Sequence, residues 1–174
     1  MGIRNPQIVV AGAGPVGCVV ALILARADIS VILLESEADL IPELRASTFH
    51  PPTLDMLDRL NVTPKLIDQG LVTPKIQYRD LVDGLVAEFD HDLIKDKTAH
   101  PYRLQCEQFK LTRVVAKMLE EYPHANIFFS SKFVDATQTN DSVTIDYETD
   151  NGLEQIKCDY LIGADGSRSA VRKS

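Results

Sequence analysis

The chain has 174 residues, of which 45% are hydrophobic and 25% charged, and its formal net charge is −7. This composition is typical of a globular domain and excludes a disordered chain. The acidic balance, without a block rich in Lys and Arg, predicts no nucleic-acid partner. The most apolar stretch, residues 16–25, is too short to span a bilayer, so no membrane span is predicted. Three widely spaced cysteines predict a reducing, cytoplasmic location, and no residues show metal-ligand spacing.

The chain begins with a short apolar run, residues 7–11, followed by the pattern G-x-G-x-x-G and a long apolar stretch. This order predicts a strand, a tight phosphate-binding turn and a helix over residues 15–27. Gly12 allows a sharp turn, Gly14 removes a Cβ where a pyrophosphate would approach, and Gly17 allows helix and sheet to pack closely. The phosphates would lie at the helix N-terminus, where free N–H groups and the helix dipole favour negative charge.

Glu35 favours this interpretation over an ordinary glycine turn. It follows the apolar run 30–34, which predicts a second strand, and it lies 23 positions after Gly12 (35 − 12). A carboxylate at this point can accept hydrogen bonds from both hydroxyls of an adenosine ribose. The alternative is an exposed glutamate after a strand. Strand, helix and second strand together predict the parallel β-α-β unit of a dinucleotide site.

The remaining chain is predicted to mix helices with antiparallel strands. After a polar, turn-like stretch over 38–48, helical periodicity predicts helices over residues 51–60, 65–69 and 106–121. Alternating patterns and turn residues predict strands over residues 76–79, 85–89, 125–131, 132–137, 142–147 and 153–162. The segment 90–101 is predicted to be irregular. A plain nicotinamide dehydrogenase domain would continue to alternate strand and helix, which this chain does not.

Four separated motifs together resemble the flavoprotein aromatic hydroxylases, the single-component FAD-dependent monooxygenases such as the para-hydroxybenzoate and phenol hydroxylases. The motifs are the glycine turn with Glu35, the tripeptide at 45–47 (Arg-Ala-Ser), Gln108 on a long helix, and the segment 158–172 with its Gly-Ala-Asp-Gly-Ser run. The resemblance covers the whole chain.

The motifs and the resemblance predict an α/β fold with a Rossmann-like FAD/NAD(P)-binding parallel sheet, an antiparallel β-meander and the start of a second, sheet-based substrate region. The predicted divisions are a FAD-binding β-α-β part over 1–74, an inserted partial substrate-region sheet over 75–104, and a return to the FAD-binding domain over 105–174.

The resemblance implies a set of residues that bind FAD, and it implies no catalytic side chain and no metal ligand. The implied cofactor residues are Gly12, Ala13, Gly14, Pro15, Val16, Gly17, Glu35, Ser36, Arg45, Ala46, Gln108, Val134, Asp165, Gly166 and Arg172. Arg45 would reach the phosphates and the ribityl side, for which a permanently charged guanidinium is suited. Gln108 would hydrogen-bond the ribityl chain. On their own, Arg45 reads as a solvated loop residue and Gln108 as a helix-surface residue.

The last motif is the most specific of the four. The resemblance implies that Asp165 and Gly166 serve both FAD and the nicotinamide nucleotide. It also implies that Arg172 binds the reduced nicotinamide and that Val134 lies where the chain runs past the adenine. On its own, Asp165-Gly166 is a turn after a strand, although strand ends are where open α/β sheets place ligands. Arg172 and its cationic neighbours are either an anion site or a solvated helix start.

The implied chemistry is hydroxylation of an aromatic, usually phenolic, ring with O₂ through a flavin hydroperoxide, with NAD(P)H as reductant and FAD as cofactor. The chain ends at Ser174, before the second flavin motif of the Gly-Asp-Ala type, so we expect weak or no FAD affinity and no hydroxylation from these 174 residues alone. Exposed apolar surface over 76–89 is expected to promote association, which leaves a homo-oligomer possible. The alternatives are a related flavin oxidoreductase that does not hydroxylate, such as a halogenase- or reductase-like enzyme, and a non-catalytic nucleotide-binding fragment.

Overall fold

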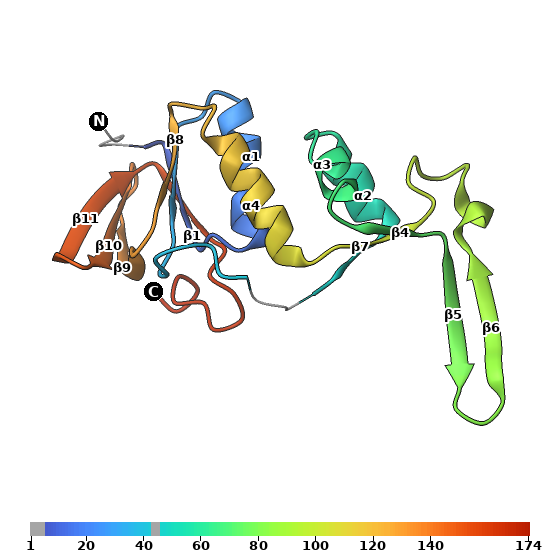
Figure 1. Cartoon of the computed structure of the whole chain (residues 1–174). Helices are drawn as coiled ribbons and strands as arrows, with labels where there is room; N and C mark the ends of the chain where they lie inside the picture. The colour runs from blue at the N-terminus through green and yellow to red at the C-terminus, as the bar shows by residue number, and fades with distance from the viewer. Residues whose placement is uncertain (1–5, 43–45) are drawn as a thin grey trace. The chain divides into compact units, whose positions relative to one another are not determined.

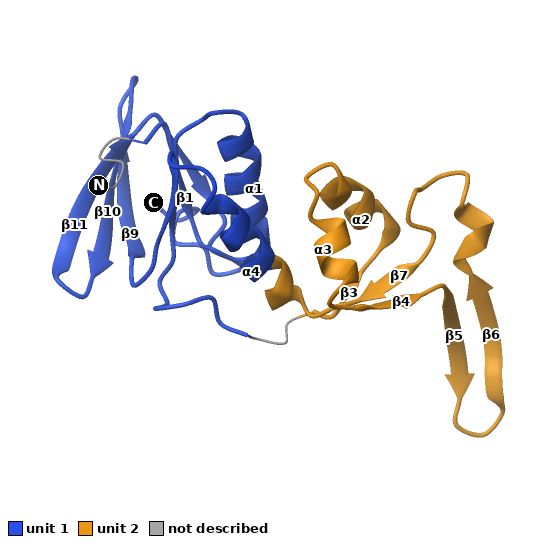
Figure 2. Ribbon diagram, turned by 45° about the horizontal axis from the view of Figure 1, so that its top comes forward, with its two compact units in different colours: residues 1–42, 112–174 blue, residues 43–111 orange. Residues whose placement is uncertain are grey.

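The computed structural model describes residues 6–42 and 46–174. The chain divides into two compact units, which Figure 2 shows in different colours. Unit 1 comprises residues 1–42 and 112–174, and unit 2 comprises residues 43–111. The predicted insertion over 75–104 lies inside unit 2, which starts earlier and ends later than that prediction.

Unit 1 is built on a parallel sheet whose strand order is β12-β1-β2-β8. Its strands are β1 (Ile8–Ala11), β2 (Val31–Leu34), β8 (Ala125–Phe128) and β12 (Tyr160–Gly163). The helix α1 (Pro15–Arg26) connects β1 to the neighbouring parallel strand β2, which confirms the predicted β-α-β unit. All four residues of β2 are buried, as expected for a parallel strand covered on both faces.

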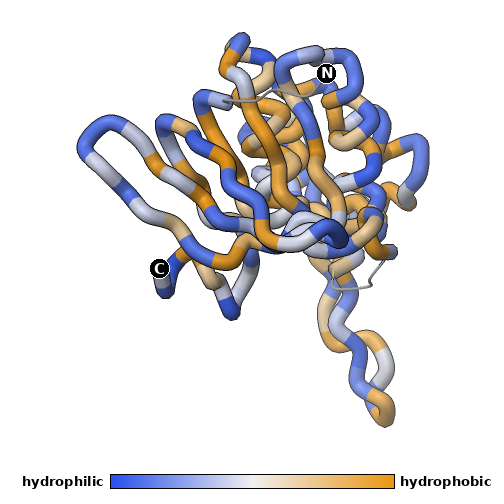
Figure 3. Tube along the Cα trace, turned by 90° about the vertical axis from the view of Figure 1, so that its left-hand side faces the viewer, coloured by the Kyte–Doolittle hydropathy of each residue, from blue (hydrophilic) through white to orange (hydrophobic). Residues whose placement is uncertain are grey.

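An antiparallel meander covers one face of this sheet. Its strands, in the order β11-β10-β9, are β9 (Lys132–Gln138), β10 (Val143–Thr149) and β11 (Gly152–Cys158). Alternate residues of β1 and β2 share one buried cluster with residues of the meander. The cluster contains Val9, Ala11, Ile32, Leu34, Phe133, Ile145, Tyr147, Ile156 and Cys158. Figure 3 shows hydrophobic (orange) positions interspersed with hydrophilic (blue) ones along the chain, as expected where only one face of a strand is buried.

Helices lie on the side of the parallel sheet away from the meander (Figure 1). The buried residues of α1 are Gly17, Cys18, Ala21, Leu22 and Ala25. The helix α4 (Gln108–Leu119) is shorter than the predicted 106–121. Its buried positions Leu111, Val115 and Leu119 recur every four residues, whereas Phe109 and Met118 are only half-buried.

Unit 2 contains short strands and two short helices. A three-stranded antiparallel sheet has the order β3-β7-β4, formed by β3 (Thr48–Phe49), β7 (Arg103–Gln105) and β4 (Leu71–Thr73). The helices are α2 (Pro51–Asp58) and α3 (Thr63–Ile67). A separate two-stranded hairpin consists of β5 (Lys75–Asp80) and β6 (Gly84–Asp90), and the short 3₁₀ helix η1 (His91–Ile94) follows it.

The structure corrects two predicted elements. The predicted single strand over 153–162 is two strands, β11 in the meander and β12 in the parallel sheet. The break lies at Asp159, because the amides of Asp159 and Tyr160 both donate to the Gln7 carbonyl (2.9 and 3.1 Å) and draw the chain toward β1. The predicted sheet over 75–104 is also divided, because β5 and β6 form a hairpin of their own whereas β7 pairs with β3 and β4, which lie before residue 75.

Candidate functional site

The glycine turn after β1 is shaped by close backbone contacts. Gly12 has a φ of +100°, in the left-handed region that favours glycine, and its amide donates to the Leu34 carbonyl (2.8 Å). A Cβ on Gly17 would lie 1.9 Å from the Gly12 carbonyl oxygen. The helix therefore packs against the turn more closely than any side chain would allow, which is the role predicted for Gly17.

Gly14 lies in open space. Its φ is −68° and its ψ 179°, which any residue can adopt, and a Cβ there would meet nothing within 4 Å. The bond from the Cys18 amide to the Gly14 carbonyl (2.9 Å) begins the helical ladder, so the amides of Gly14, Val16 and Gly17 are not used by it. Folding therefore does not require a glycine at position 14. Open space and unused backbone N–H groups at a helix N-terminus are what an approaching anion needs.

The Glu35 carboxylate holds the turn. Its Oε2 accepts from the Ala13 amide (2.9 Å), and its Oε1 accepts from the Glu37 amide (3.0 Å) and the Ser36 hydroxyl (3.1 Å). A carboxylate offers about four lone-pair positions, so these three bonds still leave capacity for a ligand. The sequence predicted a ribose acceptor at Glu35 but not its bond to the turn.

Cys18 is a residue that sequence reasoning missed. Its thiol donates to the Ala13 carbonyl (3.2 Å) from a fully buried position. Burial, together with the nearby Glu35 carboxylate, raises the pKa of Cys18 to about 12, so the thiol stays protonated and can donate. Ala13 is thus held at its N–H by Glu35 and at its carbonyl by Cys18.

The Asp-Gly motif after β12 packs against the glycine turn. The Ala164 amide donates to the Ala11 carbonyl (2.8 Å), and a Cβ on Gly12 would lie 2.6 Å from the Ala164 carbonyl oxygen. The structure therefore brings together three of the predicted features, the glycine turn, Glu35 and Asp165, at the carboxyl ends of neighbouring parallel strands. Ligands of open α/β sheets bind at this edge.

Asp165 closes the loop that follows it. Its Oδ2 accepts from the amides of Ala170 (2.6 Å) and Val171 (3.1 Å). Burial opposes its ionisation, but hydrogen bonds from Ser169 and these amides hold the pKa of Asp165 below its usual value. Its Oδ1 is buried and has no hydrogen-bond partner among the described residues. A buried acceptor of this kind is costly unless a ligand or water completes it.

The cationic segment 168–173 forms turns, and the amides of Lys173 and Ser174 both donate to the Ala170 carbonyl (2.9 and 3.1 Å). Arg172 is exposed, and its guanidinium donates to the Ser167 carbonyl (2.9 Å). Its amide donates to the Ser169 hydroxyl (3.0 Å). The arginine is therefore oriented by its own loop and keeps donors available to solvent.

In unit 2 the structure brings together two further predicted residues, Ala46 and Gln108. The Gln108 amide donates to the Ala46 carbonyl (2.9 Å), so Ala46 and the start of α4 are neighbours. Arg45 lies outside the described residues. In unit 1, Val134 is 47% exposed on β9, next to the buried Phe133, and so points away from the cluster shared with the sheet.

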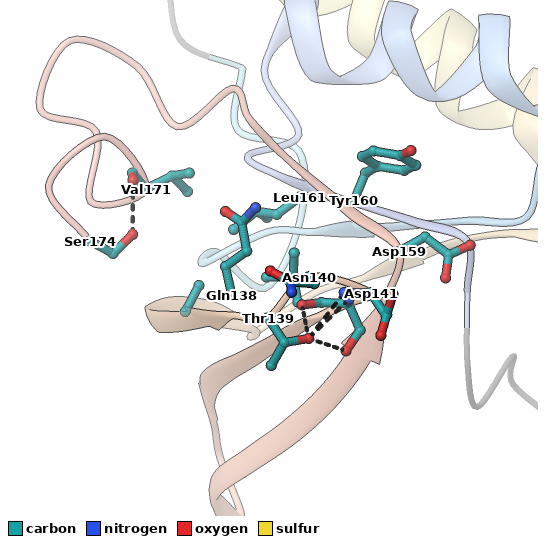
Figure 4. A pocket seen from close by; sticks show the side chains of 12 residues that line it. Gln138, Thr139, Asn140, Asp141, Asp159, Tyr160, Leu161, Val171 and Ser174 are labelled. Atoms are coloured by element: carbon teal, nitrogen blue, oxygen red, sulfur yellow. Dashed lines mark hydrogen bonds between the residues drawn. The ribbon is translucent and has the colours of Figure 1, made fainter.

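An open pocket of about 740 Å³ lies elsewhere in unit 1 (Figure 4). It is lined by the β9–β10 turn, by Asp159, Tyr160 and Leu161, and by Val171 and Ser174. It contains none of the predicted cofactor residues and adjoins the amino end of β12, opposite the edge where ligands of such sheets bind. We assign it no function. Within residues 6–42 and 46–174, no group of three His, Cys, Asp or Glu residues can hold a metal ion. No helix in the same part of the chain is long and apolar enough to cross a membrane.

The chain is similar to several monooxygenases. It is 32% identical over 166 residues to para-nitrophenol 4-monooxygenase of Pseudomonas sp. strain WBC-3, covering 95% of this chain and 41% of that protein. It is 31% identical to 6-hydroxy-3-succinoylpyridine 3-monooxygenase of Pseudomonas putida S16, covering 96% and 42% of the two chains. The solved structure of p-nitrophenol 4-monooxygenase from Pseudomonas putida DLL-E4 superposes with a TM-score of 0.93 at 30% identity, covering 98% of this chain and 43% of that one. The chain spans less than half the length of these relatives.

A family model described as the FAD binding domain matches residues 5–174. The match confirms the predicted fold class and the resemblance to the flavin-dependent aromatic monooxygenases. It also agrees with the geometry, in which an open glycine turn, the Glu35 carboxylate and an unpartnered oxygen of Asp165 lie along one sheet edge. The chain belongs to the FAD binding domain family.

Proposed function

We propose that the chain is the FAD-binding part of a NAD(P)H-dependent monooxygenase that hydroxylates an aromatic, phenolic substrate. The observation that carries the proposal is the convergence of the glycine turn, Glu35 and Asp165 at the carboxyl ends of β1, β2 and β12. The matched relatives are named as monooxygenases of nitrophenol and of a hydroxypyridine, which supports a ring bearing a hydroxyl group as the substrate class.

The glycine turn would bind the pyrophosphate, and Glu35, with Ser36 beside it, would bind the adenosine ribose. Support comes from the open space at Gly14 and from the amides of the turn that the helical ladder does not use. The turn is already braced by Glu35 and Cys18 at Ala13, so little ordering would remain to oppose binding. Val134, exposed on β9, is the proposed neighbour of the adenine.

Asp165 and Gly166 would serve the cofactor from the other side of the turn. The unpartnered Oδ1 of Asp165 fits a donor from a bound group, because an ionised carboxylate can only accept. Arg172, exposed and oriented by Ser167, would bind the reduced nicotinamide nucleotide. In unit 2, Arg45, Ala46 and Gln108 would contact the ribityl side.

FAD would supply the redox chemistry when bound, taking a hydride from NAD(P)H and transferring one atom of O₂ to the ring. The residues of this chain bind and orient the cofactor. None of them is proposed as a general acid or base. A cytoplasmic location and the possibility of a homo-oligomer belong to the same proposal.

The visible absorption spectrum of the protein purified from cells, repeated after addition of FAD and desalting, tests the proposal. Titration with ADP, followed by calorimetry, separates the two halves of the cofactor. Binding of ADP supports the unit 1 assignment, and retained flavin bands support the whole site. A protein that binds neither ADP nor FAD would contradict the proposal and favour a non-catalytic module.

A further inference from the structure

The segment 46–48 in unit 2 is held at successive positions by the start of α4 and the end of β7. The Gln108 amide donates to the Ala46 carbonyl, and the Cys106 amide donates to the Ser47 carbonyl, both at 2.9 Å. Thr48 pairs with Gln105 in the β3–β7 ladder. Because β3 has only two residues, this ladder alone gives the segment little support.

The side chain of Gln105 adds a second set of bonds to the same segment. The Ser47 carbonyl can only accept and the Arg103 guanidinium can only donate, so the amide nitrogen of Gln105 must face Ser47. In that orientation the nitrogen donates to the Ser47 carbonyl and the Thr48 hydroxyl, both at 2.9 Å, and the oxygen accepts from Arg103 Nη2 at 3.2 Å. One amide therefore makes three bonds.

The strand that carries Gln105 packs closely against Gly70 and pairs with strands on both of its edges. A Cβ on Gly70 would lie 2.8 Å from the Gln105 carbonyl oxygen and 2.9 Å from a methyl carbon of Leu104. Leu104 is fully buried. Because β7 pairs with both β3 and β4 whereas β3 has only two residues, we take Gln105 as the anchored partner and the segment 46–48 as the part that it positions.

We propose that Gln105 is a positioning residue for the flavin side of the cofactor site. It fixes the segment 46–48 against Gln108 by donating to Ser47 and Thr48, and it does not itself touch the cofactor. The inference rests on the proposed function, because it requires Ala46 and Gln108 to contact the ribityl side. Nothing in the sequence pattern alone singles out Gln105.

Three variants test the proposal. Gln105→Leu removes all three bonds, and Gln105→Glu keeps an acceptor for Arg103 but cannot donate to the Ser47 carbonyl. Gln69→Leu is the matched control, since its amide donates to the Lys65 carbonyl at an exposed position of the same unit. Amide hydrogen exchange at Cys106 and Gln108 reports on the segment without any cofactor.

We expect both Gln105 variants to speed exchange at these two amides by about tenfold or more, the effect of losing one or two hydrogen bonds. FAD affinity of both should fall by about tenfold while ADP affinity stays unchanged, because ADP lacks the ribityl chain. Gln69→Leu should leave all of these values unchanged. If Gln105→Leu unfolds unit 2, amide exchange will also become faster at Leu104. In that case the result for Gln105→Glu decides whether Gln105 positions the segment.

Unchanged exchange in Gln105→Glu would overturn the positioning role. Faster exchange with unchanged FAD affinity would overturn its connection to the cofactor, as would a wild-type chain that binds FAD no more tightly than ADP. A wild-type chain that binds neither nucleotide contradicts the proposed function instead, and the exchange rates then still decide whether Gln105 fixes the segment.

Discussion

The two units bury their apolar side chains to very different extents. In unit 1 the central strands are covered on both faces, and Val9, Val10 and Ile32 are each 0% exposed. In unit 2 the tip of the β5–β6 hairpin leaves Leu81 105% and Val82 91% exposed. A two-stranded hairpin without a covering layer is marginally stable in water. Unit 1 therefore completes its own core, whereas the hairpin of unit 2 leaves apolar surface uncovered.

The residues proposed to bind the cofactor are divided between these two units. The residues proposed for the pyrophosphate and ribose all lie in unit 1. The described residues proposed for the ribityl side, Ala46 and Gln108, lie in unit 2. We therefore expect ADP binding to tolerate changes in unit 2, and FAD binding to be sensitive to changes in both. The following predictions test this division.

The largest effect is expected from Gly17→Ala, because its Cβ would lie 1.9 Å from the backbone of the turn. We expect the unfolding free energy of unit 1 to fall by at least about 3 kcal/mol, since two backbone segments must separate. Urea unfolding followed by circular dichroism measures this. Unchanged stability would mean that the helix does not pack against Gly12 as described.

Gly14→Ala should affect binding and not folding. A Cβ at this position meets nothing within 4 Å and the backbone angles suit alanine, so unfolding should shift by only a few tenths of a kcal/mol. ADP affinity should fall by about 100-fold, as expected if the methyl group displaces two charge-assisted bonds to phosphate. Calorimetric titration decides. Full ADP affinity in this variant would contradict the proposal that the glycine turn binds the phosphates.

Glu35→Gln should lower ADP affinity by about tenfold, through the loss of a charge-assisted bond to the ribose. The neighbouring exposed Glu37→Gln is the control and should bind as the wild type does. The wild type should bind 2′-deoxy-ADP more weakly than ADP, whereas Glu35→Gln should bind both with the same affinity. The reason is that the Glu35 carboxylate and the ribose 2′-hydroxyl would form one interaction, which either change removes. Additive losses would show that Glu35 acts only by bracing Ala13.

In unit 2, Asp55→Asn should destabilise the packing of residues 98–100 against α2 and leave ADP affinity unchanged. Asp55 accepts from His100 Nδ1 and from the Thr98 hydroxyl, both at 2.7 Å. These bonds, from His100 first, lower the pKa of Asp55, so its stabilising effect is present above about pH 4 and is lost as the pH falls further. We expect a loss of about 1 kcal/mol near neutral pH. Urea unfolding at several pH values, with the exposed Asp68→Asn as control, checks it.

An effect of similar small size is expected from Tyr147→Phe in the meander. The phenol donates to Glu154 Oε2 (2.9 Å), so its loss should cost about 1 kcal/mol. Burial and this bond raise the pKa of Tyr147 to about 12. A raised pKa means stability that is complete below about pH 10 and is lost as the pH rises toward 12. The free energy of unfolding of Tyr147→Phe should therefore depend less on pH between about 10 and 12 than that of the wild type. Tyr160→Phe, which changes an exposed tyrosine of the same unit, is the control.

The nucleotide motif was readable from the sequence because its signals are local. The glycine spacing and the apolar runs beside it correctly predicted β1, the turn, α1 and β2, since each depends on residues close along the chain. The packing of Ala164 against Gly12 joins distant segments, and only the resemblance, not the local pattern, related Asp165 to the turn.

The features that were missed depend on tertiary contacts. The strands β3, β4 and β7 have two or three residues each, too few to show a periodic pattern. The break at Asp159 is produced by a single carbonyl, that of Gln7, which accepts two amides. The bonds of Gln105 and Cys18 involve side chains whose types are ordinary for a strand and a helix.

The contact between Gly12 and Ala164 has a consequence for the order in which the chain folds during synthesis. The strand β1 and its turn leave the ribosome early, but β12 and the backbone that shapes the turn follow only when residue 164 has been made. Until then β1 has β2 on one edge and an open row of backbone groups on the other. A nascent chain stalled before β12 should therefore expose that edge of β1. A chaperone or a competing strand could then bind to it.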